Sequence, residues 1–276
     1  MTQGSIGRKL LHGLLLLCGI GWVYPFVWMV AASFKTESEY YNQKLRLLPH
    51  EFQWGNYTRA WKMAHFDHYF QNSVVLTVCT VAIVVVLCAM TGYALGRVKF
   101  AGNKLFIVAI SATLFIPKGF TIIPVYMLVK SLGLLNTMPG VILAEAGGAH
   151  VLFILLFTAH FAGLPNELEE SAEMDGSGFL RTFWSVMLPL SKPIVATVVV
   201  MQAMWTWNSF LTPLIFTLNN PGLRTLSVGM FAFVGEHYND STGLAAAATI
   251  SIVPIVALFL FLQKYFVEGV AGAVKG

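Results

Sequence analysis

Long stretches without a charged residue constrain this chain more than any other feature of its sequence. They cover residues 10–34, 68–96, 146–166, 193–223 and 241–263. Each is long enough to cross a bilayer as a helix, which takes about 20 apolar residues. With 57% hydrophobic and 11% charged residues, against about 45–50% and 25% in soluble domains, a soluble fold could not bury this surface. The sequence therefore predicts an all-α integral membrane protein.

The hydropathy pattern predicts six transmembrane helices in one membrane domain that covers residues 1–276. The expected spans are 10–33, 71–95, 105–129, 139–162, 194–217 and 243–266. Arg8 and Lys9 precede the first apolar run, as in a secretory signal. That run is too long for a signal peptide and has no small-residue cleavage pattern, so we expect it to remain as the first helix.

The charges of the short loops predict which side of the membrane each loop faces. An even number of spans places both termini on the same side. The loop 97–104 carries three basic residues, whereas the loop 130–138 on the opposite side carries only Lys130. Because basic residues in short loops favour the cytoplasmic side, we expect both termini and the loop between the fourth and fifth spans in the cytoplasm.

Several classes of function are disfavoured by what the sequence lacks. It contains no G-x-x-x-x-G-K-[ST] phosphate loop, H-E-x-x-H, C-x-x-C or G-x-S-x-G motif, so it offers no ATP site, metal site or enzyme nucleophile of its own. Its cysteines, Cys18, Cys79 and Cys88, all lie within expected spans and imply no disulfide framework. Its basic residues cluster beside apolar segments rather than forming a stripe, which argues against nucleic acid as a partner.

The third expected span, 105–129, is interrupted in its middle by Pro117, Lys118 and Gly119. Non-helical backbone inside a membrane occurs where it lines a cavity or packs against protein. A charged residue at that depth is by default a candidate functional group. Lys118 is therefore a candidate residue of a solute path, with Glu145 in the next span as its candidate partner. Snorkelling of the lysine to the outer membrane surface is the alternative.

The segment between the fourth and fifth spans is too polar to cross the membrane, and its pattern predicts two short helices joined by a tight turn. Asn166 followed by Glu169 resembles a capping box, and Gly176 suits a left-handed helix end. Apolar residues then recur at i, i+3, i+4 and i+7, as on one helix face. The first helix and the turn are crowded with carboxylates, which alone would indicate a solvated surface: Glu167, Glu169, Glu170, Glu173 and Asp175.

The same segment fits a longer pattern. Glu170-Ser171-Ala172 is followed after three residues by Gly176, and after nine more by Val186, one residue and Leu188-Pro189. This resembles the E-A-A…G…I-x-L-P loop of permease subunits in binding-protein-dependent ABC importers. Ser171 stands where that family usually has Ala, and Val186 where it usually has Ile. Neither departure changes size or polarity enough to break a helix.

Other stretches extend the resemblance over nearly the whole chain and are similar to the carbohydrate, maltose-type branch of this family. They are Asn56-Tyr57, Asn72-Ser73, Ile123-Pro124-Val125-Tyr126, 132–137, Trp207-Asn208-Ser209-Phe210 and 271–276. Each stretch is a weak signal alone. Their order and spacing together identify the chain as a member of the family.

The resemblance implies that the loop sits in a cleft of a cytoplasmic ATPase subunit and transmits its closure to the transmembrane helices. It assigns this coupling role to Glu169, Glu170, Ser171, Ala172, Asp175, Gly176, Phe183 and Pro189. It also implies a second permease subunit, usually a different chain, two ATPase subunits that bind ATP and magnesium, and an extracytoplasmic solute-binding protein. The complex would import a sugar across the cell membrane of a prokaryote. The rival classes are an ion-coupled secondary transporter, which would show paired intramembrane carboxylates and inverted repeats, and a structural or signalling membrane protein.

Two further sites follow from the residues. Helical spacing places Trp205, Asn208, Ser209 and Thr212 on one face of the fifth span, and this neutral polar and aromatic set suits an uncharged polyhydroxylated solute. Packing between helices is the alternative. The outer loops 34–70 and 218–242 are too long for simple connectors and are the expected docking surface for the solute-binding protein, unless the second is only a re-entrant or loosely folded loop. The candidate contact residues are Phe231, Phe233, Glu236, His237 and Tyr238.

Overall fold

The computed structural model describes residues 3–43, 46–63, 65–148, 150–234 and 239–273, and these are helical apart from loops and one isolated antiparallel bridge. The helices long and apolar enough to cross a membrane are Gly7–Ala32, Phe66–Arg97 and Ser241–Lys264. Three further helix pairs, each bent by more than 40° at a short break, meet the same test together, which allows up to six spans. The predicted all-α class is confirmed.

The chain divides into two compact units, Met1–Asp67 with Gly229–Val253 and His68–Val228 with Pro254–Gly276. Unit 1 contains α1 (Gln3–Ala32), α2 (Glu37–Asn42), α3 (Gly55–Met63), η5 (Met230–Phe233) and the first part of α15 (Ser241–Ala273). The apolar window of α1 is 0% buried in the described structure. Its surface is therefore available to lipid or to another chain.

In unit 1, the end of α1 is fastened to α3 by hydrogen bonds to backbone carbonyls. The Asn56 side-chain amide donates to the carbonyls of Ser33 and Lys35 over 2.9 and 2.8 Å. Phe34 packs edge-on against Trp54, with ring centroids 4.9 Å apart. Because Asn56 is buried, satisfying its amide donors in this way avoids the cost of unpaired polar groups.

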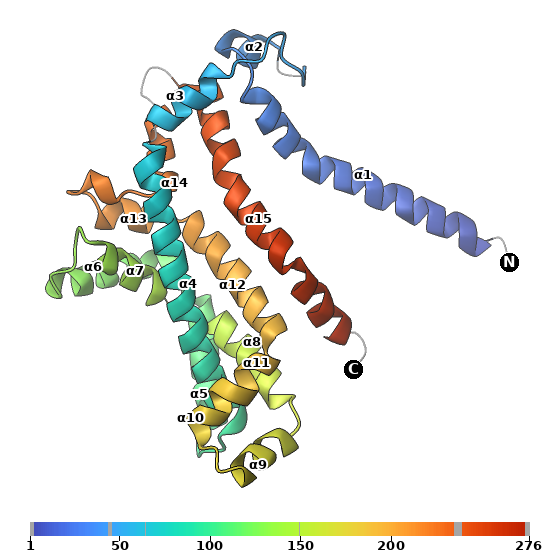
Figure 1. The fold of residues 1–276 in the computed structure, drawn as a ribbon, viewed down its shortest axis with the longest axis vertical. Helices are drawn as coiled ribbons and strands as arrows, with labels where there is room; N and C mark the ends of the chain where they lie inside the picture. The colour runs from blue at the N-terminus through green and yellow to red at the C-terminus, as the bar shows by residue number, and fades with distance from the viewer. Residues whose placement is uncertain (1–2, 44–45, 64, 149, 235–238, 274–276) are drawn as a thin grey trace. The chain divides into compact units, whose positions relative to one another are not determined.

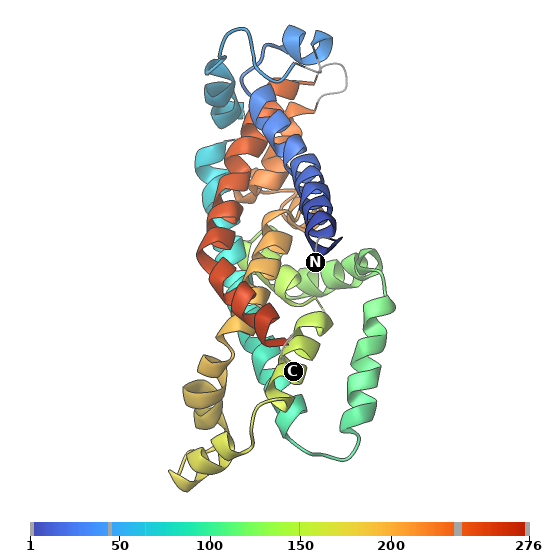
Figure 2. The same ribbon diagram turned by 90° about the vertical axis from the view of Figure 1, so that its right-hand side faces the viewer.

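Unit 2 holds the other helices. They are α4 (Phe66–Arg97, from His68 on), α5 (Asn103–Ala112), η1 (Thr113–Phe115), η2 (Lys118–Thr121), α6 (Ile122–Ser131), α7 (Met138–Ala146), α8 (Val151–Ala162), α9 (Glu167–Met174), α10 (Phe179–Thr182), η3 (Phe183–Met187), α11 (Leu188–Leu190), α12 (Lys192–Trp207), α13 (Leu211–Phe216), η4 (Pro221–Leu223), α14 (Leu226–Gly229, up to Val228) and the end of α15. Figure 1 shows α9 and α10 at the end of unit 2 where α4 stops. Figure 2 shows α6 and α7 side by side.

Glycines let α4 and α8 pack at backbone distance in the core of unit 2. A Cβ added at Gly92 would lie 2.4 Å from the Phe157 Cβ, and one at Gly96 would lie 2.8 Å from the Thr158 carbonyl oxygen. Small residues at such contacts are the usual way for apolar helices to approach closely. Phe157 is fully buried in the cluster that joins α4, α8, η3 and α12.

The break predicted in the third span is confirmed. Asn103–Phe115 and Gly119–Ser131 meet at 94°, and the backbone at Pro117 is extended. A second break, in the fourth span, was not predicted: Met138–Ala146 and Val151–Ala162 meet at 56°. α7 ends where Gly147 and Gly148 follow, and glycine is a poor helix former even in an apolar segment.

The fifth span also differs from its predicted extent. A helix over 194–217 was expected, but α12 ends at Trp207 and α13 begins at Leu211. Pro213 explains the break, since in a continuous helix its ring would clash with the Ser209 carbonyl four residues earlier. Helical spacing had predicted one face shared by Thr212 and Trp205. Because the two residues lie in different helices, this prediction is wrong.

Candidate functional site

The loop between α8 and α12 has the predicted form of two short helical segments around a glycine turn. Gly176 has φ +76°, a left-handed conformation that suits glycine best. Its N–H donates to the Glu173 carbonyl, and the Ser177 N–H donates to the Ala172 carbonyl, each over 2.9 Å. This pattern closes the C-terminus of α9. The second segment runs through α10, the π-helical η3 and α11.

A group that we name the Glu169 clamp, formed by Tyr93, Arg97 and Glu169, ties α9 to the end of α4. The Arg97 Nε donates to one carboxylate oxygen of Glu169 over 2.6 Å, and the Tyr93 hydroxyl donates to the other over 2.6 Å. The Arg97 side chain is only 6% exposed and also donates to the Leu164 carbonyl over 2.9 Å. Charge-assisted bonds of this kind are the strong class of hydrogen bond.

The clamp corrects the predicted capping box. Asn166 is the residue before α9, but its side chain makes no capping hydrogen bond, and the Glu169 carboxylate turns to α4 instead. A buried guanidinium offers Glu169 stronger donors than a backbone N–H does. Tyr93 and Arg97 were missed as site residues, although their i, i+4 spacing already places them on one helix face.

Aromatic contacts tie the second half of the loop to the same place. The Tyr93 ring stacks on Phe179 of α10 at 4.6 Å and lies 5.4 Å from Phe183 of η3. Phe183 and Met187 are buried in the core that α4 shares with α8. Both halves of the loop are thus held by the last turns of α4.

The predicted coupling residues divide into an inward and an outward set. Glu169 is half-buried, while Ala172 and Phe183 are buried. The exposed members are Glu170, Ser171, Asp175, Gly176 and Pro189. Three large apolar side chains that were not among the predicted coupling residues are also exposed: Met174, at 89% exposure, Leu180 and Trp184. We call the exposed residues Glu170, Met174, Asp175, Leu180 and Trp184 the loop face. Its Met and Trp side chains are of the kinds enriched at protein contacts.

The candidate solute path includes a contact of Glu145, the residue that the sequence analysis had named as a candidate partner of Lys118. The Ser209 hydroxyl donates to the Glu145 carboxylate of α7 over 2.5 Å, a contact that the sequence analysis did not predict. Lys118 begins η2, and its side chain is outside the described part of the structure. Trp205 stacks on Phe153 of α8, with centroids 4.9 Å apart.

The other residues considered for the path lie in α12, at its C-terminal end and in α13. Asn208 caps the end of α12 and is exposed, with its amide donating to the Met204 carbonyl over 2.8 Å. Thr212 is in α13 and partly exposed. Gln202, one turn before Thr206, is buried and donates to the Thr206 hydroxyl over 2.9 Å. The path residues that the structure brings together are therefore Trp205 and Ser209, with Glu145 added.

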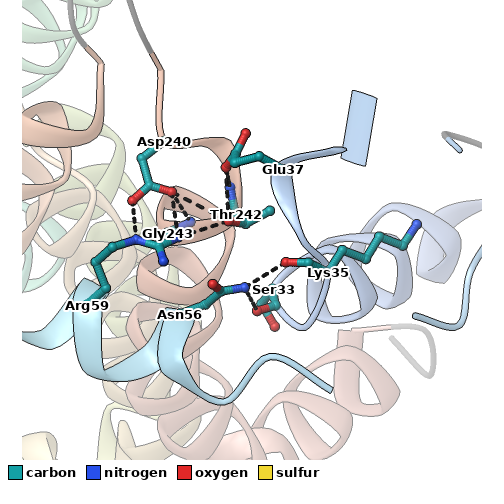
Figure 3. Close-up of polar contacts among 8 residues, drawn as sticks. All are labelled: Ser33, Lys35, Glu37, Asn56, Arg59, Asp240, Thr242 and Gly243. Carbon is teal, nitrogen blue, oxygen red and sulfur yellow. Dashed lines mark hydrogen bonds and ion pairs between the residues drawn. The ribbon is translucent and has the colours of Figure 1, made fainter. Parts of the chain in front are cut away.

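In unit 1 a polar group, the Arg59 cluster, joins α3 to the start of α15. Arg59 donates to both carboxylate oxygens of Asp240 over 2.5 and 2.8 Å and to the Thr242 hydroxyl over 3.0 Å. The Glu37 carboxylate accepts from the Thr242 N–H over 2.8 Å, and the Gly243 N–H donates to Asp240 over 2.8 Å. Figure 3 shows these side chains converging, with the Lys35 ammonium pointing away from them.

The Arg59 cluster borders a cavity of about 520 Å³, which Gln53 and Phe233 also line. Burial by itself would raise the pKa of Asp240, but the hydrogen bonds from Arg59 and the Gly243 N–H lower it below the usual value for aspartate. The carboxylate is therefore held in its charged form by its partners.

Of the predicted docking residues, the structure describes Phe231 and Phe233. Phe231 is 59% exposed, whereas Phe233 is buried within unit 1. Glu236, His237 and Tyr238 lie outside the described residues. Within the described part of the chain, no group of three or more His, Cys, Asp or Glu side chains could hold a metal ion.

Comparisons with known proteins match most of the chain. The model of the family "Binding-protein-dependent transport system inner membrane component" matches residues 88–272, which include the loop between α8 and α12 and the candidate path residues. The probable ABC transporter permease YurM of Bacillus subtilis is 36% identical, over 98% of this chain and 90% of its own. The diacetylchitobiose uptake system permease NgcG of Streptomyces coelicolor is 32% identical, over 92% and 84%. The melibiose/raffinose/stachyose import permease MelC of Bacillus subtilis is 31% identical, over 91% of each chain.

A solved structure shares the fold. It is a bacterial ABC transporter involved in the import of the acidic polysaccharide alginate, with a TM-score of 0.80 at 24% sequence identity. The similarity covers 96% of this chain and 99% of the matched chain. The fold of this chain, with its bent helix pairs and the loop between α8 and α12, is thus shared with a solved bacterial ABC transporter.

Proposed function

The chain belongs to the family of inner membrane components of binding-protein-dependent transport systems, and from that membership we propose that it forms half of the translocation path of an ATP-driven sugar importer. Its relatives are named permeases, so it is a multi-pass transporter subunit rather than an enzyme. The observation that carries the proposal is the coupling loop, which presents the loop face outward while the Glu169 clamp fixes it to α4.

In this proposal all 276 residues form one membrane domain with six spans and cytoplasmic termini. The three long apolar helices supply three spans, and each bent pair supplies one more. Irregular backbone at membrane depth is tolerated where it lines a cavity or packs on protein, which fits breaks such as that at Pro117. The 165–190 loop then lies in the cytoplasm, on the side of the basic loop 97–104.

The loop couples the permease to a separate ATPase subunit that binds ATP and magnesium. Of the coupling residues, Glu170, Ser171, Asp175, Gly176 and Pro189 are exposed and available for contact. Glu169, Ala172 and Phe183 are turned inward and hold the loop to α4 and α8. Movement of the ATPase would reach the spans through this second set.

The solute is a sugar or oligosaccharide delivered by an extracytoplasmic binding protein. The names of NgcG and MelC state oligosaccharide cargoes, which supports a sugar here. Trp205, Asn208, Ser209, Thr212 and Lys118 are the path residues proposed for this chain. A second permease, by analogy a different chain, would supply the other half.

Docking of the binding protein is assigned to unit 1 and its outer loops. Phe231 is exposed there and precedes Ala232 and Phe233, which line the cavity beside the Arg59 cluster. Phe233 is buried, so it would support the shape of this surface from the protein interior rather than contact the binding protein. Glu236, His237 and Tyr238 complete the proposed contact.

Uptake in proteoliposomes tests the proposal. The permease is reconstituted with its partner chains and binding protein, and a panel of radiolabelled sugars is offered with and without internal ATP. Uptake of one of these sugars should require ATP and the ATPase subunit, and it should survive an uncoupler. Uptake that needs no ATP but collapses with the uncoupler would instead establish an ion-coupled transporter.

A further inference from the structure

A small polar pocket lies where both halves of the coupling loop meet the end of α4. It measures about 200 Å³, and its lining includes Tyr93 and Arg97 of α4, Glu169 and Glu173 of α9, and Phe179 and Thr182 of α10. All of these residues belong to unit 2. Pockets for whole small molecules usually measure about 300–1,000 Å³, so this pocket has room for a single side chain rather than for a larger ligand.

The hydroxyl of Thr182 indicates that the pocket takes a ligand. Thr182 is only 2% exposed, yet its hydroxyl has no hydrogen-bond partner within the part of the chain that the structure describes. Most buried polar groups have a partner, because leaving one unpaired costs free energy. Since Thr182 lines the pocket, a polar group inside the pocket is the candidate partner for this hydroxyl.

The charge of the lining favours a cation as that ligand. Glu169 and Glu173 are four residues apart on α9, so their carboxylates lie on one side of the helix. Arg97 offsets only Glu169, and its remaining donors go to backbone carbonyls. Within the described ranges Glu173 takes part in no ion pair. The other basic residue of the loop, Arg181, is exposed and does not line the pocket.

The oxygens that remain available in the pocket can all accept a hydrogen bond. The Tyr93 hydroxyl gives its one proton to Glu169, and the Glu173 carboxylate and the Thr182 hydroxyl can both accept. An ammonium group has three N–H donors and no acceptor, so it matches these three oxygens in number and in charge. The ring of Phe179, stacked on Tyr93 at 4.6 Å, adds an aromatic face of the kind that attracts cations.

We propose that this pocket, which we call the loop pocket, receives the ammonium group of a lysine side chain from the ATPase subunit. The inference rests on the proposed function and adds the chemistry of one contact to it. Glu173 is exposed on the same helix as Glu170 and Met174 of the loop face, so a partner on that face can reach the pocket. The lysine would touch α4, α9 and α10 together, and a displacement of the ATPase would act on all three.

Affinity measurements between the permease pair in nanodiscs and the purified ATPase subunit test this contact. Glu173→Gln and Thr182→Val should each raise the Kd about tenfold, as expected for the loss of one hydrogen bond to a charged group. Thr182→Ser keeps the hydroxyl and should keep the wild-type Kd. The matched control is Glu167→Gln, which removes another exposed carboxylate of α9 that does not line the pocket and should leave the Kd unchanged.

Two further measurements separate the contact from a structural role. Thr182→Val removes no hydrogen bond within the described protein, so the unfolding midpoint of the permease should not fall, whereas a structural hydroxyl would lower it. A carbodiimide joins a carboxylate to an amine that touches it. In the wild-type complex it should link Glu173 to a lysine of the ATPase, which mass spectrometry identifies, and the link should be absent in Glu173→Gln.

The outcomes distinguish this inference from the proposed function. A wild-type Kd for Glu173→Gln, or the absence of Glu173 among the cross-linked residues, would overturn the inference and leave the loop pocket to water. Glu173→Gln and the cross-link decide the question even where Thr182→Val does not fold. Failure of the wild-type permease to bind any ATPase subunit would instead count against the proposed function itself.

Discussion

The Tyr93 hydroxyl near the end of α4 donates to the Glu169 carboxylate of α9 over 2.6 Å, across 76 residues of chain. With Arg97 on the other oxygen, the carboxylate is held from both sides. A residue that the motif assigns to coupling thus faces the permease rather than the partner. The contact separates Glu169, which is held to α4, from loop residues such as Glu170 and Asp175, which are exposed.

Removing the arginine of the Glu169 clamp should uncouple the complex. Arg97→Met leaves Glu169 without its cation and several carbonyls without a donor, at a cost of roughly 3 kcal/mol for breaking a largely buried pair. We expect a lower unfolding midpoint and a loss of sugar-stimulated ATPase activity in the reconstituted complex. The exchange Arg97→Glu with Glu169→Arg should recover part of both losses. Equal damage in the single and exchanged variants would show that the pairing itself does not matter.

The turn at Gly176 can be tested against a matched glycine. Gly176→Val forces a β-branched residue into the left-handed region, at about 1–2 kcal/mol or more, although its Cβ would meet no atom within 4 Å. Transport should collapse while membrane insertion persists. Gly178 has an ordinary φ of −81° and equally open space, so Gly178→Val should be tolerated. Similar transport by both variants would contradict a conformational role for Gly176.

The close contact of α4 and α8 predicts a steric effect. Gly92→Ala would place a Cβ 2.4 Å from that of Phe157, and overpacking of this kind costs about 1–3 kcal/mol. We expect a lower unfolding midpoint for the purified permease in detergent. Gly13→Ala in α1, where no atom lies within 4 Å of the added Cβ, is the control and should not lower the midpoint.

The Arg59 cluster predicts a pH dependence of stability. Because the pKa of Asp240 is lowered in the folded protein, its ionised form stabilises the fold above the unfolded pKa of about 3.9, and this stabilisation is lost as pH falls through the lowered pKa. Asp240→Asn should lower the unfolding midpoint at pH 6 and flatten its fall between pH 6 and pH 3. The control Asp175→Asn, on the exposed loop, should keep the wild-type slope. Identical slopes in all three proteins would exclude Asp240 as the titrating group.

The topology can be mapped with reporter fusions. Alkaline phosphatase, active only outside the cytoplasm, should be inactive when fused after Gly102 or Gly176 and active when fused within 41–55 or after Asn220. The expectation rests on the basic loop 97–104. Activity after Gly102 would reverse the orientation and remove the coupling role of the loop.

The sequence predicted the features that depend on neighbouring residues. Long apolar runs produced the helices, Pro117 the bend of the third span, and Gly176 the left-handed turn. It missed those set by distant partners or by weak local signals. Glu169 was assigned to a helix cap because Tyr93 and Arg97 lie more than 70 residues away, and the break after Ala146 was hidden by the apolar residues around it.

The same limit applies to the candidate path. Helical spacing placed Trp205 and Thr212 on one helix face. Pro213 is incompatible with a continuous helix through Ser209, so the two residues lie in separate helices. Glu145 had been paired with Lys118 because both are charged and lie in apolar spans. That pairing stays a prediction, because the Lys118 side chain lies outside the described residues. The structure adds the Ser209 hydroxyl against the Glu145 carboxylate, a contact that no pattern of charge or periodicity predicts.

The glycines of α4 have a mechanical consequence. Because Gly92 and Gly96 bring the backbone of α4 against α8 with no side chain between them, the two helices cannot slide past one another without steric overlap. The Glu169 clamp adds α9 to the same rigid group. A force applied to α9 would therefore reach α4 and α8 as one packed body rather than as two helices that move separately.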